Sequence, residues 1–191
     1  MTDAVRLPDP ETAILALASG SAVILRERTR AGLAMLAQRV SSLCRARRIR
    51  VLVAGDWRLA LGVGAGGLHL PEAAIRHGLN RWRRVRRRDW MVTAAAHSPL
   101  AIRLAARRGV DAVLLSPVFA TASHPDASPL GPLRFTRWAR ESPLPVYALG
   151  GIDAGHARRL RGSGAAGFAG IGGLTPTVNQ PRLRSNSRTP E

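Results

Sequence analysis

The sequence predicts an α/β fold of the TIM type, in which parallel strands alternate with helices and curl into a barrel. Three apolar segments, 111–119, 145–151 and 167–173, each end in small or hydroxylic residues. Near-continuous apolar segments are typical of strands that are buried on both faces. A glycine that ends a helix and is followed closely by an apolar strand recurs at Gly64, Gly109 and Gly164. This repeat counts the strand–helix units along the chain.

Extending these units outward gives strands at 22–27, 50–56, 67–70, 90–95, 111–119, 145–150 and 167–172. Helices are expected at 11–19, 31–48, 58–63, 99–108, 133–142 and 154–161, and a further one starts at Pro71. The helix at 31–48 has the clearest pattern, because Leu33, Leu36, Val40 and Cys44 fall on one stripe. Seven strands are one short of a closed barrel of eight.

We expect the barrel to lack its first strand and its last helix. Residues 1–3 resemble the polar end of a strand whose apolar body is absent, and we expect such a strand to be encoded upstream of Met1. Residues 175–191 have the composition of a disordered tail without an amphipathic pattern. The expected organisation is one phosphate-binding domain over 1–174, followed by this tail.

The composition indicates a soluble, cytoplasmic protein. The chain has 191 residues, of which 46% are hydrophobic, and no apolar stretch is long enough to span a bilayer. No secretory leader is recognisable before the first expected helix. The single cysteine, Cys44, cannot form an internal disulfide and is expected to be a buried helix residue.

The net charge of +17 comes entirely from arginine on the basic side, because the chain has no lysine. Schiff-base and amine-nucleophile chemistry are therefore excluded for its side chains. The densest basic segment is 81–88, RWRRVRRR. It is interpreted either as a solvated surface or as an anion-binding patch, and nucleic acid is the less favoured partner.

Two pairs of glycines follow the last two strands and predict a phosphate site. Gly150 and Gly151 end one strand, and Gly172 and Gly173 end the next. Glycine lets the backbone approach a phosphate closely, and its N–H groups can bind the anion without a charged side chain. In barrels of this kind, the loops after strands seven and eight are the usual phosphate site.

Other strand ends carry side chains with two interpretations each. Arg26 and Arg28 alternate with Glu27, so both are expected to point to one side of the strand and to clamp a pyrophosphate, although a structural ion pair is the alternative. Asp56 is a candidate Mg²⁺ ligand or the N-cap of the next helix. Thr121 and Ser123 place hydroxyls two residues apart, which suits phosphate oxygens or a plain loop.

Two histidines also end strands. His69 and His97 are interpreted as hydrogen-bonding structural residues more readily than as catalysts.

The ordered recurrence of these motifs resembles thiamine phosphate synthases and the related thiazole tautomerases. The resemblance covers about 170 residues and rests on LRER, AGD, GAGGLHLPE, AAAHS, SPVFATASHPDASPLGP, ALGGI and GAAGFAGIGGL. It implies a transferase that joins hydroxymethylpyrimidine pyrophosphate to thiazole phosphate. Pyrophosphate leaves first, and the thiazole nitrogen traps the resulting pyrimidine-methyl cation. Such a reaction needs electrostatic stabilisation and positioning more than proton transfer.

The resemblance also assigns residues. It implies that Arg26 and Arg28 hold the pyrophosphate and that Asp56 binds Mg²⁺. The catalytic set would be Arg26, Arg28 and Ser123, and the substrate-binding set would be Thr121, Ser123, His124, Gly150, Gly151, Gly172 and Gly173.

The sequence departs from the family pattern at several of these positions. The expected second acidic metal ligand is Ala74, with Glu72 two positions away. The family's loop lysine is His124, and its strand-five serine is Ala95. Pro117 stands where a tautomerase would have a histidine. The alternatives are therefore a tautomerase-like or regulatory binder of thiazole phosphate and, less favoured, a basic nucleic-acid-binding protein.

Overall fold

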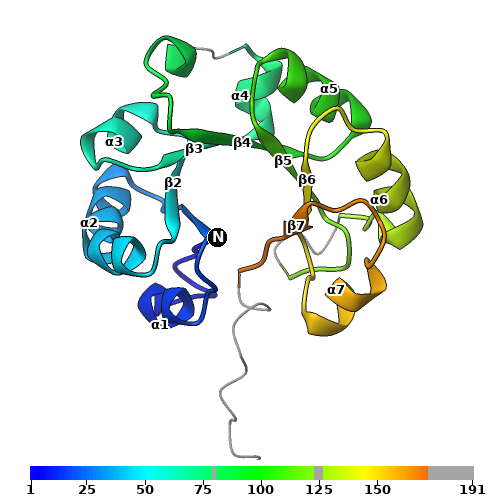
Figure 1. Cartoon of the computed structure of the whole chain (residues 1–191), viewed down its shortest axis with the longest axis horizontal. Coiled ribbons are helices and arrows are strands. Elements are labelled where there is room, and N and C mark those ends of the chain that lie inside the picture. Colours follow the sequence, from blue (N-terminus) through cyan, green and yellow to red (C-terminus); the bar gives the residue numbers. More distant parts are fainter. Residues whose placement is uncertain (79–80, 123–126, 172–191) are drawn as a thin grey trace, which may run out of the picture.

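The computed structural model describes residues 1–78, 81–122 and 127–171 (Figure 1). Within them, seven parallel strands pair in chain order, and the sheet curls into an open barrel with helices on its outside. The strands are β1 (Ala22–Leu25), β2 (Arg50–Ala54), β3 (Gly67–Leu70), β4 (Met91–Ala96), β5 (Ala112–Leu115), β6 (Val146–Ala148) and β7 (Gly167–Phe168). The helices are α1 (Pro10–Leu15), α2 (Arg30–Ala46), α3 (Trp57–Gly62), α4 (Glu72–Arg76), α5 (Pro99–Arg107), α6 (Gly131–Arg140) and α7 (Ala154–Arg159), with a 3₁₀ helix at Arg81–Arg84. The predicted fold class is confirmed.

Five strands end earlier than predicted, and two of these differences shape the cavity described below. The strand predicted at 22–27 ends at Leu25, which pairs with Val53 of β2. The N–H of the next residue, Arg26, donates to Oγ1 of Thr2 (2.8 Å). The strand predicted at 111–119 ends at Leu115, since Pro117 has no N–H group to continue the ladder. The N–H groups of the residues that follow, Val118 and Phe119, instead donate to the carbonyls of Leu149 and Gly150, at 2.9 and 3.1 Å.

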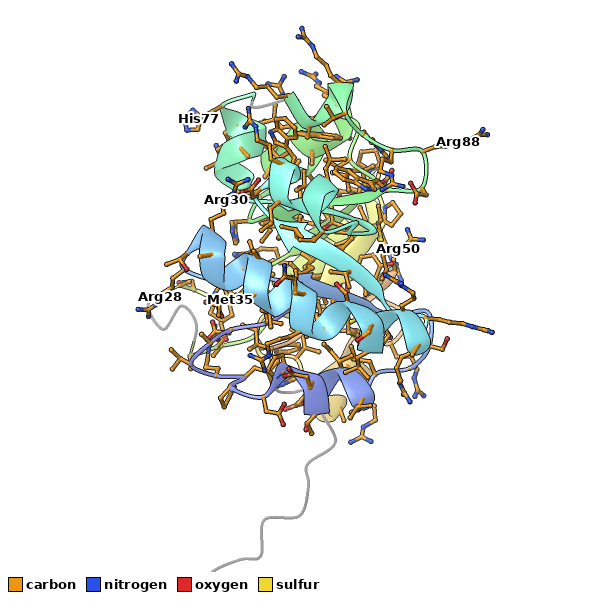
Figure 2. All side chains as sticks on the ribbon, turned by 90° about the vertical axis from the view of Figure 1, so that its left-hand side faces the viewer. Arg28, Arg30, Met35, Arg50, His77 and Arg88 are labelled. Carbon is orange, nitrogen blue, oxygen red and sulfur yellow. The ribbon has the colours of Figure 1, made fainter. Side chains whose placement is uncertain are left out.

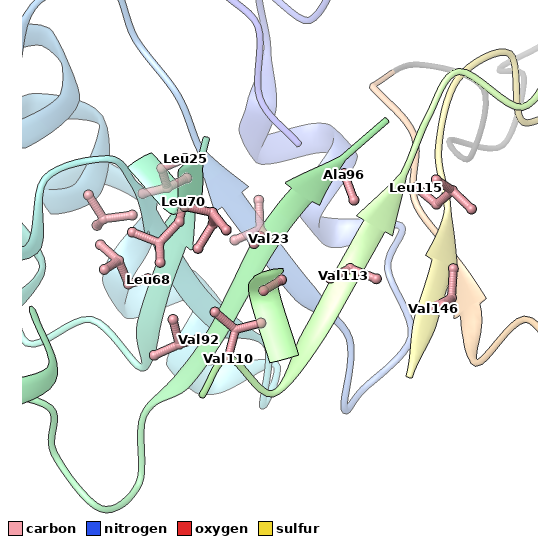
Figure 3. Packing of buried hydrophobic residues seen from close by; sticks show 14 of the residues in the cluster. Val23, Leu25, Leu68, Leu70, Val92, Ala96, Val110, Val113, Leu115 and Val146 are labelled. Carbon is pink, nitrogen blue, oxygen red and sulfur yellow. The ribbon is translucent and has the colours of Figure 1, made fainter. Parts of the chain in front are cut away.

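The apolar side chains form two separate clusters. The larger cluster lies between the sheet and the helices, and Figure 3 shows part of it, with Leu25, Leu68, Val92 and Leu115 among its members. Helix α2 contributes the predicted stripe, including the free and buried Cys44. Burial raises the pKa of the Cys44 thiol to about 11, so this thiol is unreactive at neutral pH.

The smaller cluster fills the inside of the barrel. Ile24, Leu52 and Leu114 are its buried members, with Met91 and Tyr147 packed against them. Side chains alternate between the two clusters along β1, β2, β4, β5 and β6, as expected for a barrel with apolar residues on both faces.

The barrel is open between β1 and β7, which are the two edges of the described sheet. The first residues of the chain bridge this opening, as the position of the N-terminus in Figure 1 shows. The N–H of Thr2 donates to the carbonyl of Ile24 (2.9 Å), and the N-terminal ammonium of Met1 donates to the carbonyl of Gly170 (2.9 Å). Residues 1–2 thus occupy the place expected for the end of a first strand.

A groove of about 370 Å³ continues along this opening toward the amino ends of the strands. Its lining is mainly apolar and comes from α1 on one side and from the barrel interior on the other; Leu7, Ile14, Leu17, Ile24 and Leu114 contribute. The segment in which we expect no last helix, and the tail from residue 175, lie outside the described residues. Among the described residues, no helix is both long enough and apolar enough to cross a membrane.

Candidate active site

A cavity of about 790 Å³ lies at the carboxyl ends of the strands and is lined by the loops that follow them. Figure 2 separates the two ends of the barrel, because Arg28 follows β1 on one side and Arg50 starts β2 on the other. Arg88, from the basic segment 81–88, lies at the end of Arg50 and therefore away from the cavity. In barrels of this type, binding sites are built at the carboxyl end.

Two arginines lie on one side of the cavity and share a single carboxylate. The guanidinium groups of Arg6 and Arg26 both donate to Oδ2 of Asp3, at 2.7 and 2.8 Å, and both arginines line the cavity. The hydrogen bonds from Arg6 are the main cause that holds the pKa of Asp3 well below its usual range. Guanidinium groups at the rim of a cavity are well suited to bind an anionic ligand.

The predicted clamp of Arg26 and Arg28 does not form. The chain leaves the strand after Leu25, so the alternation that would put both side chains on one side does not apply. Arg26 lines the cavity, whereas Arg28 is exposed and projects outward from the end of the barrel (Figure 2). Arg6 takes the second position, and the spacing of Asp3 and Arg6 is the signal that could have indicated it.

The first glycine pair forms a close turn just after β6 and lines the cavity. Gly150 and Gly151 have φ angles of +95° and +63°, which disfavour other residues. A Cβ atom on Gly151 would lie 2.4 Å from the carbonyl oxygen of Ala120 and 2.9 Å from Cβ of Phe119. Among the described residues, the N–H groups of both glycines have no hydrogen-bond acceptor. These two amides are therefore available to an anion in the cavity.

The rest of the predicted phosphate site is only partly described. Thr121 lines the cavity beside Gly150 and Gly151. Ser123, His124, Gly172 and Gly173 lie outside the described residues, although Gly170 and Ile171, just before the second glycine pair, do line the cavity. The structure thus brings together Arg26, Thr121 and the first glycine pair.

A histidine that the sequence did not single out lies next to the glycine turn. His156 lines the cavity, and its ring stacks on Phe119 with the centroids 4.0 Å apart. The guanidinium of Arg159 lies over the same Phe119 ring at 5.2 Å. Asp153 caps α7 by accepting from the N–H of His156 (2.7 Å), and this bond lowers the pKa of Asp153. The spacing Asp-x-x-His before a short helix was the available signal.

The residues assigned to Mg²⁺ are engaged elsewhere. Oδ1 of Asp56 accepts from the N–H of Leu59 (2.8 Å) as the N-cap of α3, and Oδ2 pairs with Nε of Arg30 (2.7 Å). Glu72 accepts from Arg76 with one oxygen and from the N–H of His97 with the other (2.8 Å). In the described part of the chain, no group of three or more His, Cys, Asp and Glu side chains could hold a metal. The described residues therefore do not fit a magnesium site built by the protein alone.

Two histidines, His69 and His97, also line the cavity. Nδ1 of His97 lies 2.7 Å from the carbonyl oxygen of Ser116, which can only accept, so this nitrogen carries the proton. His69 lies among Ala54, Ala95 and Leu149 and is 5% exposed. Burial, together with the positive charges of the N-terminus and Arg26, lowers the pKa of His69 to about 4. His69 is therefore neutral at physiological pH.

The free energy of unfolding is expected to fall in mild acid because of His69. The unfolded chain takes up a proton on this side chain below pH about 6.5, whereas the folded chain does so only near the folded pKa of about 4. As the pH falls from the unfolded pKa to the folded pKa, this difference in protonation lowers the free energy of unfolding by about 3 kcal/mol. Urea unfolding at pH 7 and pH 4.5 measures the difference in the free energy of unfolding between the two pH values. This difference should be smaller for His69→Asn than for the unmodified chain. An equal pH effect in both would contradict the buried neutral state.

The comparisons with known proteins agree with this geometry. The family model described as thiamine monophosphate synthase matches residues 6–174. The thiamine-phosphate synthase of Methylobacillus flagellatus is 31% identical over 180 residues, covering 91% of this chain and 82% of that protein. The corresponding protein of Methanospirillum hungatei JF-1 is 29% identical over 176 residues, covering 90% and 83%.

One solved structure supports the fold in the same way. The thiamine phosphate pyrophosphorylase of Pyrococcus furiosus superposes with a TM-score of 0.70 at 22% identity, covering 89% of this chain and 82% of that chain. At this identity, the likeness concerns the arrangement of strands and helices alone.

Proposed function

The chain belongs to the thiamine monophosphate synthase family, and we propose that its cavity joins hydroxymethylpyrimidine pyrophosphate to thiazole phosphate with release of pyrophosphate. The observation that carries the proposal is that two kinds of anion-binding group line one cavity. Arg6 and Arg26 contribute guanidinium groups (the arginine side), and Gly150 and Gly151 contribute N–H groups that have no acceptor among the described residues (the glycine side). Two phosphorylated substrates require two such groups. The proposed setting is the cytoplasm.

In this proposal, the arginine side binds the pyrophosphate of the pyrimidine substrate. The bond between the pyrimidine methylene carbon and the pyrophosphate oxygen breaks, and its electron pair leaves with the pyrophosphate. Arg26 and Arg6 stabilise the growing negative charge on the leaving group, and such preorganised donors contribute most where charge develops. Asp3 holds both guanidinium groups in place before the substrate arrives.

The glycine side binds the phosphate of the thiazole and directs the ring nitrogen toward the methylene cation. The nitrogen lone pair forms the new carbon–nitrogen bond, and the thiazole becomes a thiazolium. No proton changes place in this step, so the protein needs no general base. Holding both substrates in one cavity supplies the remaining rate gain through orientation.

The direct test is to incubate the protein with both phosphorylated precursors and to separate the products by chromatography. Thiamine phosphate and pyrophosphate should form in equal amounts. Saturable binding of thiazole phosphate without product would instead support the tautomerase-like or regulatory alternative.

Substitution of the two arginines that were predicted to form a clamp should separate their roles. Arg26→Ala should lower kcat/KM for the pyrimidine pyrophosphate by about 100-fold or more, because a charged donor to the leaving group is lost. The matched control Arg28→Ala should stay within about threefold of the unmodified protein, since Arg28 is exposed and is not among the residues that line the cavity. Steady-state kinetics with purified variants measures both. Equal losses in the two variants would contradict the placement of the pyrophosphate at Arg6 and Arg26.

A chelator should have little effect on turnover, because Asp56 and Glu72 are engaged in helix caps and ion pairs. We expect EDTA to lower kcat/KM by less than about threefold. Asp56→Asn should be similarly mild, since asparagine also caps helices and the pair with the exposed Arg30 contributes little. Loss of most activity in both experiments would show that Asp56 binds Mg²⁺ during the reaction.

A further inference from the structure

The barrel interior contains a buried polar pair just beneath the cavity. His69 and Thr93 face each other across β3 and β4, and Nδ1 of His69 lies 2.9 Å from Oγ1 of Thr93. The two side chains are 5% and 2% exposed. Their neighbours on the inside of the barrel are the apolar residues Leu52, Met91 and Leu114. A polar pair in such surroundings is retained only where its hydrogen bonds are satisfied.

The pair fixes which nitrogen of His69 carries the proton. A buried hydroxyl must donate its proton, and in the described part of the chain Nδ1 of His69 is the acceptor within reach of Thr93. Thr93 therefore donates to Nδ1, and the proton of the neutral imidazole lies on Nε2. The low pKa of His69 keeps this form in place down to mildly acidic pH.

Nε2 of His69 is consequently an N–H donor without a protein acceptor among the described residues. Part of the surface of Nε2 is accessible, because this atom is not among the fully buried side-chain atoms without a hydrogen-bond partner in the described residues. His69 lines the cavity, and its fellow lining residues at this depth are Ala54, Ala95 and Leu149. The remaining direction for the Nε2 proton is therefore into the cavity.

We propose that Nε2 of His69 donates a hydrogen bond to a ring nitrogen of the pyrimidine substrate and thereby selects this ring at the floor of the cavity. The inference rests on the proposed function for the identity of the substrate. A ring nitrogen of a pyrimidine is a neutral acceptor, and it fits a neutral donor between apolar side chains. Phosphate groups, in contrast, are drawn to Arg6, Arg26 and the glycine amides.

This orientation places the pyrimidine ring below and its pyrophosphate toward the arginines. His69 then acts in substrate selection and does not stabilise the leaving group. A site built to donate to a ring nitrogen discriminates strongly against a ring that lacks it, because the donor would be left unpaired.

Three variants separate this role from a structural one. His69→Asn keeps an oxygen that can accept from Thr93 but removes the donor into the cavity. It should raise KM for the pyrimidine pyrophosphate about tenfold or more, with kcat nearly unchanged and KM for thiazole phosphate within about twofold. His69→Gln places an amide near the position of Nε2 and should restore most of the affinity. Thr93→Val removes the hydroxyl that fixes the tautomer of His69. Its KM for the pyrimidine pyrophosphate should lie between those of the unmodified protein and His69→Asn.

Nitrogen-15 NMR of the imidazole provides a readout that does not need turnover. We expect a protonated Nε2 and an unprotonated Nδ1 at neutral pH, and a shift of the Nε2 signal on addition of hydroxymethylpyrimidine phosphate. If this shift occurs but no thiamine phosphate forms, the proposed function fails and the role of His69 stands. If thiamine phosphate forms normally and His69→Asn leaves both KM values unchanged, or raises both equally, the role of His69 is overturned.

Discussion

Gly151→Ala is expected to abolish measurable binding of thiazole phosphate. The added Cβ would lie 2.4 Å from the carbonyl oxygen of Ala120, and the φ of +63° disfavours any residue with a side chain. The turn must therefore move, and the N–H groups that face the cavity move with it. We expect a loss of affinity of about 100-fold or more and a stability cost of about 2–4 kcal/mol.

The matched control is Gly62→Ala, at the end of α3. Its added Cβ would meet nothing within 4 Å, so neither stability nor affinity should change appreciably. Isothermal titration with thiazole phosphate and urea unfolding give the two quantities. Gly151→Asp should be worse than Gly151→Ala in both, because it adds a negative charge to the same clash. Unchanged affinity in Gly151→Ala would remove the glycine amides from the site.

Fusing a five-residue apolar strand directly to Met1 is expected to stabilise the protein. Such a strand continues the direction already taken by residues 1–2 and can pair with the free edges of β1 and β7. Its side chains would alternate between the barrel interior and α1, and both surroundings are apolar. We expect a gain of about 2 kcal/mol or more, which raises Tm by about 4–8 °C.

Two controls distinguish strand pairing from a general effect of added length. A Gly-Ser extension of the same length should leave Tm unchanged. Ala22→Pro removes an N–H group that faces the open edge of β1. The carbonyl of Ser21 accepts from Arg50 and so faces β2, whereas the carbonyl of Ile24 accepts from Thr2 and so faces the opening. Ala22 alternates with Ser21 and therefore faces the opening, as Ile24 does. This variant should cancel most of the gain from the apolar extension. A gain that survives in Ala22→Pro would exclude pairing along β1.

The fold was predictable because its determinants are local. Apolar segments and helix-ending glycines recur with a regular spacing, and such patterns need no knowledge of distant contacts. The ends of the strands at Leu25 and Leu115 were predicted less well. Each depends on where a neighbouring strand stops or on the lost donor of Pro117, and an apolar run alone does not reveal this.

The site was predictable where it depends on the backbone and less so where it depends on side-chain direction. Gly150, Gly151 and Thr121 line the cavity as the motifs indicated. Arg28 does not, because its direction was inferred from a strand that had already ended. Arg6 and His156 were missed, since their contacts with Asp3 and Phe119 are tertiary and leave only weak signals in the sequence.

The hydrogen bond between Met1 and Gly170 joins residues that are 169 positions apart in the chain. The wall of the cavity between Arg26 and Ile171 is therefore complete only after the last strand has joined the sheet. A partly synthesised or partly unfolded chain lacks the closed cavity, so its substrates bind the fully folded state almost exclusively. Saturating substrate then opposes global unfolding by the full free energy of binding, whereas local opening elsewhere in the barrel is left unaffected.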